Sequence, residues 1–211
     1  MVITCDAVLK VFPPGTRAVD GVSLSLPPRT VALLSGGNGA GKSTLLRCIA
    51  RLLRPTRGSV RYGWDLHAPG LPPPLTYLGE ADYLYGTATV GENLRIAQRL
   101  VHAPAQHLEQ SVTLWGLDRW WQRPCHELSR GQRRRVALGR AWLVATKVLL
   151  LDEPLVGLDP AGAAQFHAAV RAVVNEGRAV IVASQTAEAF QGLLAMEWQM
   201  EQGRVVHTVA H

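Results

Sequence analysis

The sequence lacks any run of about 18 uncharged apolar residues, the length that a membrane-spanning helix requires. Its first residues, MVITCDAVLKVF, alternate like a strand and lack the basic start and long apolar middle of a signal peptide. Cysteine is scarce: Cys5, Cys48 and Cys125 are widely spaced, odd in number and form no CxxC pair. We therefore expect a cytoplasmic chain with buried free thiols and no disulfide framework.

Lysine and aromatic residues are also few. Of the 22 basic residues only 3 are lysine, and aromatic residues make up 6% of the chain. A net charge of +6 would suit a nucleic-acid partner, but no aromatics are interleaved with the basic clusters as a base-stacking surface requires. We expect no nucleic-acid partner. The 47% hydrophobic fraction over 211 residues is ordinary for a globular protein with a sizeable core.

Helical and strand patterns alternate along the chain, which predicts an α/β fold with a largely parallel sheet. Short apolar or alternating runs predict strands over residues 30–35, 59–62, 148–151 and 179–183. Apolar residues at helical spacing predict helices over residues 45–53, 90–100, 106–114, 129–144 and 160–175. The proline-rich segment 69–74 predicts a loop.

The pattern changes between residues 82 and 147, where strand runs vanish and predicted helices follow one another. We expect a single domain in which residues 1–81 and 148–211 form the α/β core. Residues 82–147 would then form a helical subdomain inserted into that core.

The segment SGGNGAGKSTLL, from Ser35 to Leu46, matches the pattern G-x-x-x-x-G-K-[ST] between a predicted strand and a predicted helix. Inward backbone N–H groups and the helix N-terminus make such a loop a cradle for phosphates. Lys42 would reach the β- and γ-phosphates, Ser43 would coordinate Mg²⁺, and Thr44 would contact the α-phosphate side. The other candidate nucleotide ligands are Gly36, Gly37, Asn38, Gly39, Ala40 and Gly41.

The segment VLLLDEP, residues 148–154, places two acids at the carboxyl end of a buried strand, where α/β sheets bind ligands. Asp152 can hold Mg²⁺, and Glu153 can orient or deprotonate an attacking water. The alternative is a strand end capped by solvated acids, which the accompanying phosphate loop disfavours.

Between these motifs lies LSRGQRRRVALGRAWL, residues 128–143, and LDP follows at 158–160. The arrangement resembles that of the ATP-binding subunits of ABC transporters. In that family an LSGGQ signature is followed by a helix and then by a strand that ends in acidic residues, as VLLLDEP does here. The resemblance covers nearly the whole chain. It implies a P-loop NTPase (RecA-like) core with an N-terminal antiparallel β portion, an inserted α-helical subdomain, and ATP and Mg²⁺ as ligands. It also implies that Phe12 stacks on adenine, although a core aromatic is the alternative.

The resemblance further implies a head-to-tail dimer, expected to be a homodimer, in which each ATP lies between one phosphate loop and the partner's signature. The signature residues are Ser129, Arg130, Gly131 and Gln132. Ser129 and Gly131 fall at a predicted helix N-terminus, where a hydroxyl and free N–H groups suit an anion. We interpret the remaining arginines of this helix as a solvated face: Arg133, Arg134, Arg135 and Arg140.

Three positions depart from the family pattern. Glu80 stands where the family usually has a glutamine after a segment like YLG, residues 77–79, and it remains a competent Mg²⁺ ligand. Arg130 replaces a glycine and either clamps the partner's γ-phosphate or points outward. Gln185 replaces the switch histidine, so it can donate a hydrogen bond but cannot carry charge, and we expect slower hydrolysis more than weaker binding.

The resemblance implies an ATPase that powers a separate membrane permease, bound peripherally at the inner face of the membrane. The permease would dock near residues 80–86, with Tyr83, Leu84 and Tyr85 as apolar contacts; the alternative is that these side chains pack locally within the helical lobe. The motifs look most like the compact ATPase of the haem exporter in cytochrome c maturation, in which the position of Glu80 is commonly histidine. Other possibilities are another importer or exporter subunit, a regulatory ATP-binding module with negligible turnover, or an ABC ATPase of DNA repair or translation.

Overall fold

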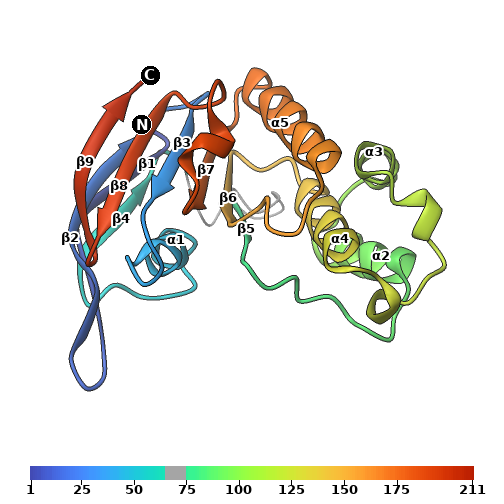
Figure 1. Cartoon of the computed structure of the whole chain (residues 1–211), viewed down its shortest axis with the longest axis horizontal. Coiled ribbons are helices and arrows are strands. Elements are labelled where there is room, and N and C mark those ends of the chain that lie inside the picture. Colours follow the sequence, from blue (N-terminus) through green and yellow to red (C-terminus); the bar gives the residue numbers. More distant parts are fainter. Residues whose placement is uncertain (65–74) are drawn as a thin grey trace.

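The computed structural model describes residues 1–64 and 75–211, and the loop expected over residues 69–74 lies outside the described residues. Two sheets lie beside a group of helices (Figure 1). The smaller sheet is antiparallel with strand order β2-β1-β4. Its strands are β1 (Ile3–Phe12), β2 (Thr16–Leu26) and β4 (Arg57–Tyr62).

The larger sheet has the strand order β5-β6-β7-β3-β8-β9 and is parallel except for the pairing of β8 with β9. Its strands are β3 (Val31–Ser35), β5 (Leu75–Leu78), β6 (Val148–Asp152), β7 (Ala179–Ser184), β8 (Met196–Glu201) and β9 (Arg204–Ala210). The predicted strands at 30–35, 148–151 and 179–183 are confirmed as β3, β6 and β7, and the strand at 59–62 as β4.

The central parallel strands are buried on both faces. Leu149 of β6 belongs to the core cluster that contains Phe166, whereas its neighbour Leu150 belongs to the cluster that contains Leu45. Successive side chains of a strand point to opposite faces, so a strand covered on both faces must be apolar throughout. The run VLLL therefore fits a sheet with helix α5 on one face, and helix α1 and the antiparallel sheet on the other.

The helices are α1 (Lys42–Ile49), α2 (Val90–Leu100), α3 (Ala105–Trp115), α4 (Arg130–Trp142) and α5 (Pro160–Asn175). Helices α2, α3 and α4 pack against one another and form the lobe at the right of Figure 1. A capping box at Thr89 and Glu92 starts α2. The helix predictions for 90–100 and 160–175 are confirmed, and those for 106–114 and 129–144 are correct within two residues at each end.

The helix predicted over residues 45–53 is wrong at both ends. It begins at Lys42 because Gly41, with φ of 102°, turns the chain directly into the helix. It ends at Ile49 because Arg51 adopts a left-handed conformation with φ of 61°. Residues beyond that point form turns, and Leu52 is 62% exposed.

No individual strand was predicted from the sequence at β2, β5, β8 or β9. Strand β8, MEWQME, alternates apolar and polar residues and could have been recognised, whereas β9 has no buried residue and β5 has only 4 residues, so the patterns of these two strands are weak. The prediction of free, buried cysteines is confirmed for Cys5, Cys48 and Cys125. In the described part of the chain, no helix has both the length and the apolar character of a membrane span.

Candidate functional site at the phosphate loop

The glycine-rich loop joins β3 to α1 and encloses the side chain of Lys42, which is 6% exposed. Its Nζ donates hydrogen bonds to the carbonyl oxygens of Gly36 at 2.6 Å and Gly37 at 3.0 Å. Burial lowers the pKa of Lys42, and the nearby carboxylates of Glu153 and Asp152 partly oppose that shift. The loop therefore holds an ammonium group at the start of a helix, where anions are favoured.

Two glycines of the loop have no room for a side chain. Gly41 has φ of 102°, and a Cβ there would lie 2.1 Å from the carbonyl oxygen of Ala18 in β2. Gly36 has φ of 143°, and a Cβ there would lie 2.2 Å from the carbonyl oxygen of Met200 in β8. The loop is thus pressed against both sheets, which explains why glycine is needed at these two positions.

At the carboxyl end of β6, Asp152 is 1% exposed. Its Oδ2 accepts a hydrogen bond from the Tyr77 hydroxyl at 3.3 Å, and that hydroxyl accepts one from Arg47 Nε at 3.4 Å. Its Oδ1 is buried and has no partner within the described residues. A buried carboxylate oxygen without a partner is costly, so this atom suits a cation ligand. Sequence reasoning missed Tyr77 and Arg47, since neither belongs to a local motif.

Glu153 follows in a left-handed conformation, with φ of 47°. Its N–H donates to the carbonyl of Ala183 at 2.9 Å, and its Oε2 accepts a hydrogen bond from the Ser184 hydroxyl at 3.1 Å. Few non-glycine residues adopt this conformation, and such outliers gather at functional sites. Strand β7 therefore fixes both the backbone and the side chain of this acid.

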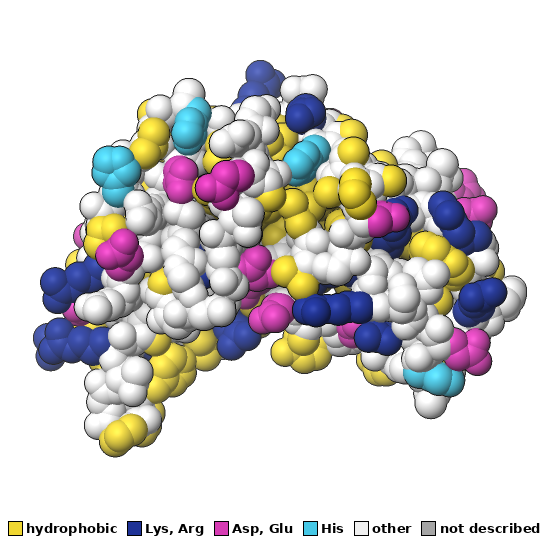
Figure 2. Space-filling model, viewed as in Figure 1, with side chains coloured by type: hydrophobic (Ala, Val, Ile, Leu, Met, Phe, Trp, Pro, Cys, Tyr) yellow, Lys and Arg dark blue, Asp and Glu magenta, His cyan; other side chains and the backbone are white. Residues whose placement is uncertain are grey.

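A pocket of about 340 Å³ is lined by most of the predicted phosphate-loop residues, though not by Gly36 or Gly37. The residues distant in sequence that also line it are Ala18, Glu80, Glu153, Val156 and Gln185. From the loop and α1 it is lined by Asn38, Gly39, Ala40, Gly41, Lys42, Ser43 and Thr44. Figure 2 shows acidic and basic side chains side by side above the notch between the two lobes. Basic, acidic and amide groups thus converge on a site of a size that suits phosphate groups.

Phe12 lies outside this lining. It stands at the end of β1, where the β1–β2 hairpin extends away from the sheets (Figure 1), and is 36% exposed. The ammonium of Lys10 lies 5.2 Å from its ring centroid. The alternative of a core aromatic does not fit this exposure, while the adenine contact stays a prediction.

The signature residues also lie outside the pocket. Ser129 Oγ accepts a hydrogen bond from the Gln132 N–H at 3.2 Å, and Gln132 Oε1 accepts one from the Ser129 N–H at 2.9 Å. This capping box starts α4 and leaves the serine hydroxyl proton free to donate. Gly131 packs against the Gly157 backbone, since a Cβ at Gly131 would lie 2.3 Å from the Gly157 carbonyl oxygen. The signature thus forms a separate surface at the start of α4.

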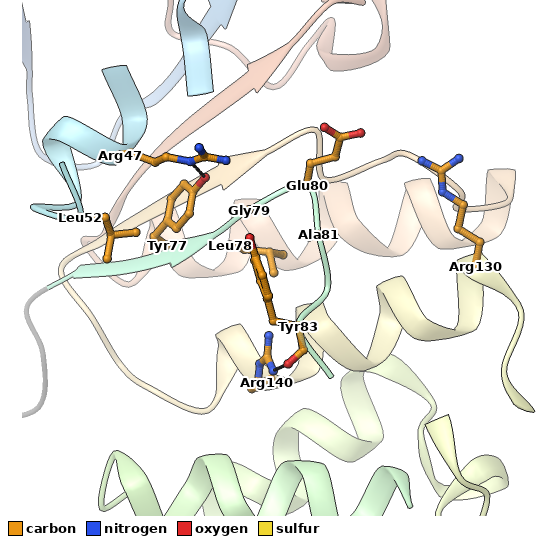
Figure 3. Close-up of a pocket in the computed structure, with 10 residues that line it drawn as sticks. All are labelled: Arg47, Leu52, Tyr77, Leu78, Gly79, Glu80, Ala81, Tyr83, Arg130 and Arg140. Atoms are coloured by element: carbon orange, nitrogen blue, oxygen red, sulfur yellow. Dashed lines mark hydrogen bonds between the residues drawn. The ribbon is translucent and has the colours of Figure 1, made fainter. Parts of the chain in front are cut away.

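A groove of about 620 Å³ runs from β5 past Glu80 towards the helical lobe (Figure 3). Arg130 and Glu80 line the same end of it, so the Arg130 side chain lies towards the groove. Tyr83 lines the groove and is 73% exposed, whereas Tyr85 is exposed outside it. Leu84 instead packs against the core of the lobe. Of the three expected apolar contacts, only Tyr83 faces this groove.

The interpretation of the α4 arginines as a solvated face is wrong. Arg134 is 4% exposed, and its partners among the described residues are all backbone carbonyls. Arg135 Nη2 lies 2.7 Å from Asp159 Oδ1, and Arg133 Nε lies 3.3 Å from an Asp82 carboxylate oxygen. Helical spacing alone cannot reveal these partners, because they come from other elements.

The sequence matches the family profile described as ABC transporter over residues 19–156. It is 41% identical over 175 residues to the cytochrome c biogenesis ATP-binding export protein CcmA of Bordetella bronchiseptica, an alignment covering 81% of this chain and 77% of that protein. The protein of the same name from Gluconobacter oxydans is 39% identical, with 82% and 76% covered. The energy-coupling factor transporter ATP-binding protein EcfA of Carboxydothermus hydrogenoformans is 30% identical, with 92% and 76% covered.

Solved structures share the fold. An ATP-binding subunit of an ABC transporter superposes with a TM-score of 0.89 at 21% identity, covering 100% of this chain and 90% of that one. CbiO1 from Clostridium perfringens, part of the ABC transporter complex CbiONQ, gives a TM-score of 0.82 at 23% identity, covering 99% and 88%. The chain therefore belongs to the ATP-binding subunits of ABC transporters, a family of ATPases. Its similarity to the CcmA proteins extends over about four-fifths of its length.

Proposed function

We propose that the chain binds ATP at the phosphate loop and hydrolyses it to drive a separate membrane permease. The observation that carries this proposal is the convergence of Lys42, Glu153 and Gln185 on one pocket. The loop N–H groups and the Lys42 ammonium would hold the β- and γ-phosphates. Thr44 would contact the α-phosphate side, and Phe12 would stack on the adenine.

Mg²⁺ fits the residues present. The buried, unpartnered Oδ1 of Asp152 suits a hard cation, and Ser43 and Glu80 line the adjoining pocket with oxygen ligands of the kind Mg²⁺ prefers. In the described residues, no group of three or more His, Cys, Asp or Glu could hold a metal alone, so phosphate oxygens and water would complete the coordination. When bound, the ion would neutralise charge that develops on the phosphates.

Glu153 would orient and deprotonate the attacking water. The Ser184 hydroxyl holds one of its carboxylate oxygens, and within residues 1–64 and 75–211 no side chain hydrogen-bonds to the other oxygen and competes with water. Gln185 would donate a hydrogen bond to the γ-phosphate. Because an amide donor is neutral, it stabilises the developing charge less than a protonated histidine would.

The signature residues would act on the nucleotide of a second subunit. Ser129, Arg130, Gly131 and Gln132 form an N-terminal helix surface that does not line the phosphate-loop pocket of their own chain. A head-to-tail homodimer would bring that surface to the partner's γ-phosphate. Arg130 adds a cation where the family pattern has glycine.

The relatives named CcmA support haem export for cytochrome c maturation as the transport process, with the chain bound peripherally at the inner face of the membrane. The groove beside Glu80 and Tyr83 would receive the permease. Because the chain is also similar to EcfA, a subunit of another importer or exporter is one alternative. Because Glu80 and Gln185 replace the usual residues, a regulatory module with negligible turnover is a second alternative. Purification of the chain from membranes and identification of the copurifying permease would decide the transport process.

Titration of the full chain with ATP and Mg²⁺ tests the core of this proposal. We expect saturable binding, together with phosphate release that follows ATP concentration. Absence of binding would refute the whole assignment. Binding without phosphate release would instead favour the regulatory module.

We predict that Gln185→His raises kcat, because an imidazole that can become protonated stabilises the transferring phosphoryl group better than a neutral amide. The expected gain is about 3- to 10-fold, with a KM for ATP that changes little. Steady-state phosphate release measured on both proteins checks this. Exposed Gln191→His supplies a control for an added histidine outside the pocket, and an unchanged or lower rate for Gln185→His would contradict the switch role.

A further inference from the structure

Arg134 lies in the first half of α4, is 4% exposed and makes no salt bridge among the described residues. Its guanidinium instead donates to five backbone carbonyl oxygens. They belong to Asp152 at 2.7 Å, Gly79 at 2.8 Å, Glu153 at 2.9 Å, Pro154 at 3.1 Å and Glu80 at 3.2 Å. A planar guanidinium has five N–H donors in a fixed geometry, so this site uses its shape as well as its charge.

The five carbonyls come from two segments that end side by side. Strands β5 and β6 are parallel neighbours, with Leu78 paired to Leu151, so their carboxyl ends lie at the same edge of the sheet. Glu80 follows β5 and Glu153 follows β6, and both line the phosphate-loop pocket. Arg134 thus joins the helical lobe to the main chain beneath both acids.

The turn after β6 depends on this contact. Three consecutive carbonyls, from Asp152 to Pro154, point to one guanidinium. The middle residue, Glu153, has φ of 47°, a conformation that costs free energy in a non-glycine residue. Its N–H is bonded to Ala183 on the other side, so Arg134 and β7 hold this residue from both directions.

Charge supports the same arrangement. Burial lowers the pKa of Arg134, and the carboxylates of Asp152, Asp82, Glu80 and Glu153 oppose that shift. An arginine remains protonated even when buried. Its positive charge therefore offsets the acids that surround the pocket, including the extra carboxylate at Glu80.

We propose that Arg134 is a positioning residue that fixes the backbone of Glu153 and Glu80 together, so that a shift of α4 moves both acids relative to the bound nucleotide. The effect of Arg134 on kcat rests on the proposed ATP hydrolysis. The effect of Arg134 on the backbone of Glu153 and Glu80 does not depend on turnover. The signature that begins α4 and the two acids would then respond as one unit when subunits close on ATP.

A second arginine that is largely covered and also donates to backbone carbonyls provides a control. The Arg178 side chain is 12% exposed, and it donates to the carbonyls of Thr146 at 2.7 Å and Val144 at 3.2 Å. Burial lowers its pKa as it does for Arg134. It does not line the phosphate-loop pocket. Substitution by lysine keeps the charge at both positions but removes the planar set of donors.

The test compares Arg134→Lys with Arg178→Lys in the full chain. We expect Arg134→Lys to lower kcat about 10- to 100-fold while the KM for ATP changes less than about 3-fold, because small displacements of a reacting group cost rate more than binding. Arg178→Lys should keep the wild-type kcat. Equal kcat losses in the two variants, or an unchanged kcat in Arg134→Lys, would overturn the proposal.

Amide hydrogen exchange separates this inference from the proposed function. Arg134→Lys should speed exchange at Glu153 and Val156, whose N–H groups bond to the carbonyl oxygens of Ala183 and Glu153. Arg178→Lys should speed exchange only near residues 144–147. If the wild type shows no turnover, the proposed function fails and exchange alone decides the inference. Exchange in Arg134→Lys that matches the wild type at Glu153 and Val156 would then refute it.

Discussion

The Glu153→Gln variant should bind ATP as the wild type does and should lose at least about 100-fold in kcat, the lower range for a general base. The amide keeps the size of the side chain and can still contact the Ser184 hydroxyl, which lies 3.1 Å from Oε2. It cannot accept a proton from water. ATP should therefore remain bound, and the variant should accumulate as an ATP-bound dimer.

Phosphate release and size-exclusion chromatography with ATP and Mg²⁺ measure the two effects. Glu109→Gln, an exposed change on α3, serves as the matched control and should behave like the wild type in both assays. A wild type that releases phosphate no faster than Glu153→Gln would contradict hydrolysis. In that case the protein would act by binding ATP alone, and Glu80 and Gln185 would be the residues to examine first.

The phosphate loop and the acidic strand end could be predicted because their chemistry lies in short, continuous segments. The spacing from Gly36 to Lys42 specifies both the turn and the charge, and the apolar run before Asp152 specifies a buried strand. The resemblance to ABC ATPases added Glu80 and Gln185, which the structure brings to the same pocket as Lys42. Long, regular helices such as α2 were predictable for the same local reason.

The contacts that support the site could not be predicted. Tyr77 reaches Asp152 across 75 positions of sequence, and Arg134 reaches Gly79 across 55. In the sequence, Arg134 is one of several arginines at helical spacing, a pattern that usually indicates a solvated surface. Only the packing of α4 against the ends of β5 and β6 distinguishes it from its neighbours. Short motifs could therefore be predicted from the sequence. The contacts that support those motifs depend on tertiary structure and could not.

The second large effect is expected for Gly41→Ala. Its φ of 102° is unfavourable for a residue with a side chain, and the new Cβ would lie 2.1 Å from the Ala18 carbonyl oxygen. Backbone strain and overpacking together should lower the free energy of unfolding by about 2–4 kcal/mol. Since this glycine also directs the chain into α1, a shift of the loop should weaken ATP binding by at least about 10-fold.

Gly37→Ala is the matched control, because the same methyl group there meets nothing within 4 Å and Gly37 has no positive φ. Its stability should stay within about 0.5 kcal/mol of the wild type. Thermal unfolding without nucleotide isolates the stability effect, and ATP titration at a temperature where both variants are folded isolates the binding effect. Similar values for the two variants would mean that the loop can move away from β2 without cost. The close contact between Gly41 and Ala18 would then have no part in shaping the phosphate site, so the comparison tests whether the antiparallel sheet supports the nucleotide loop.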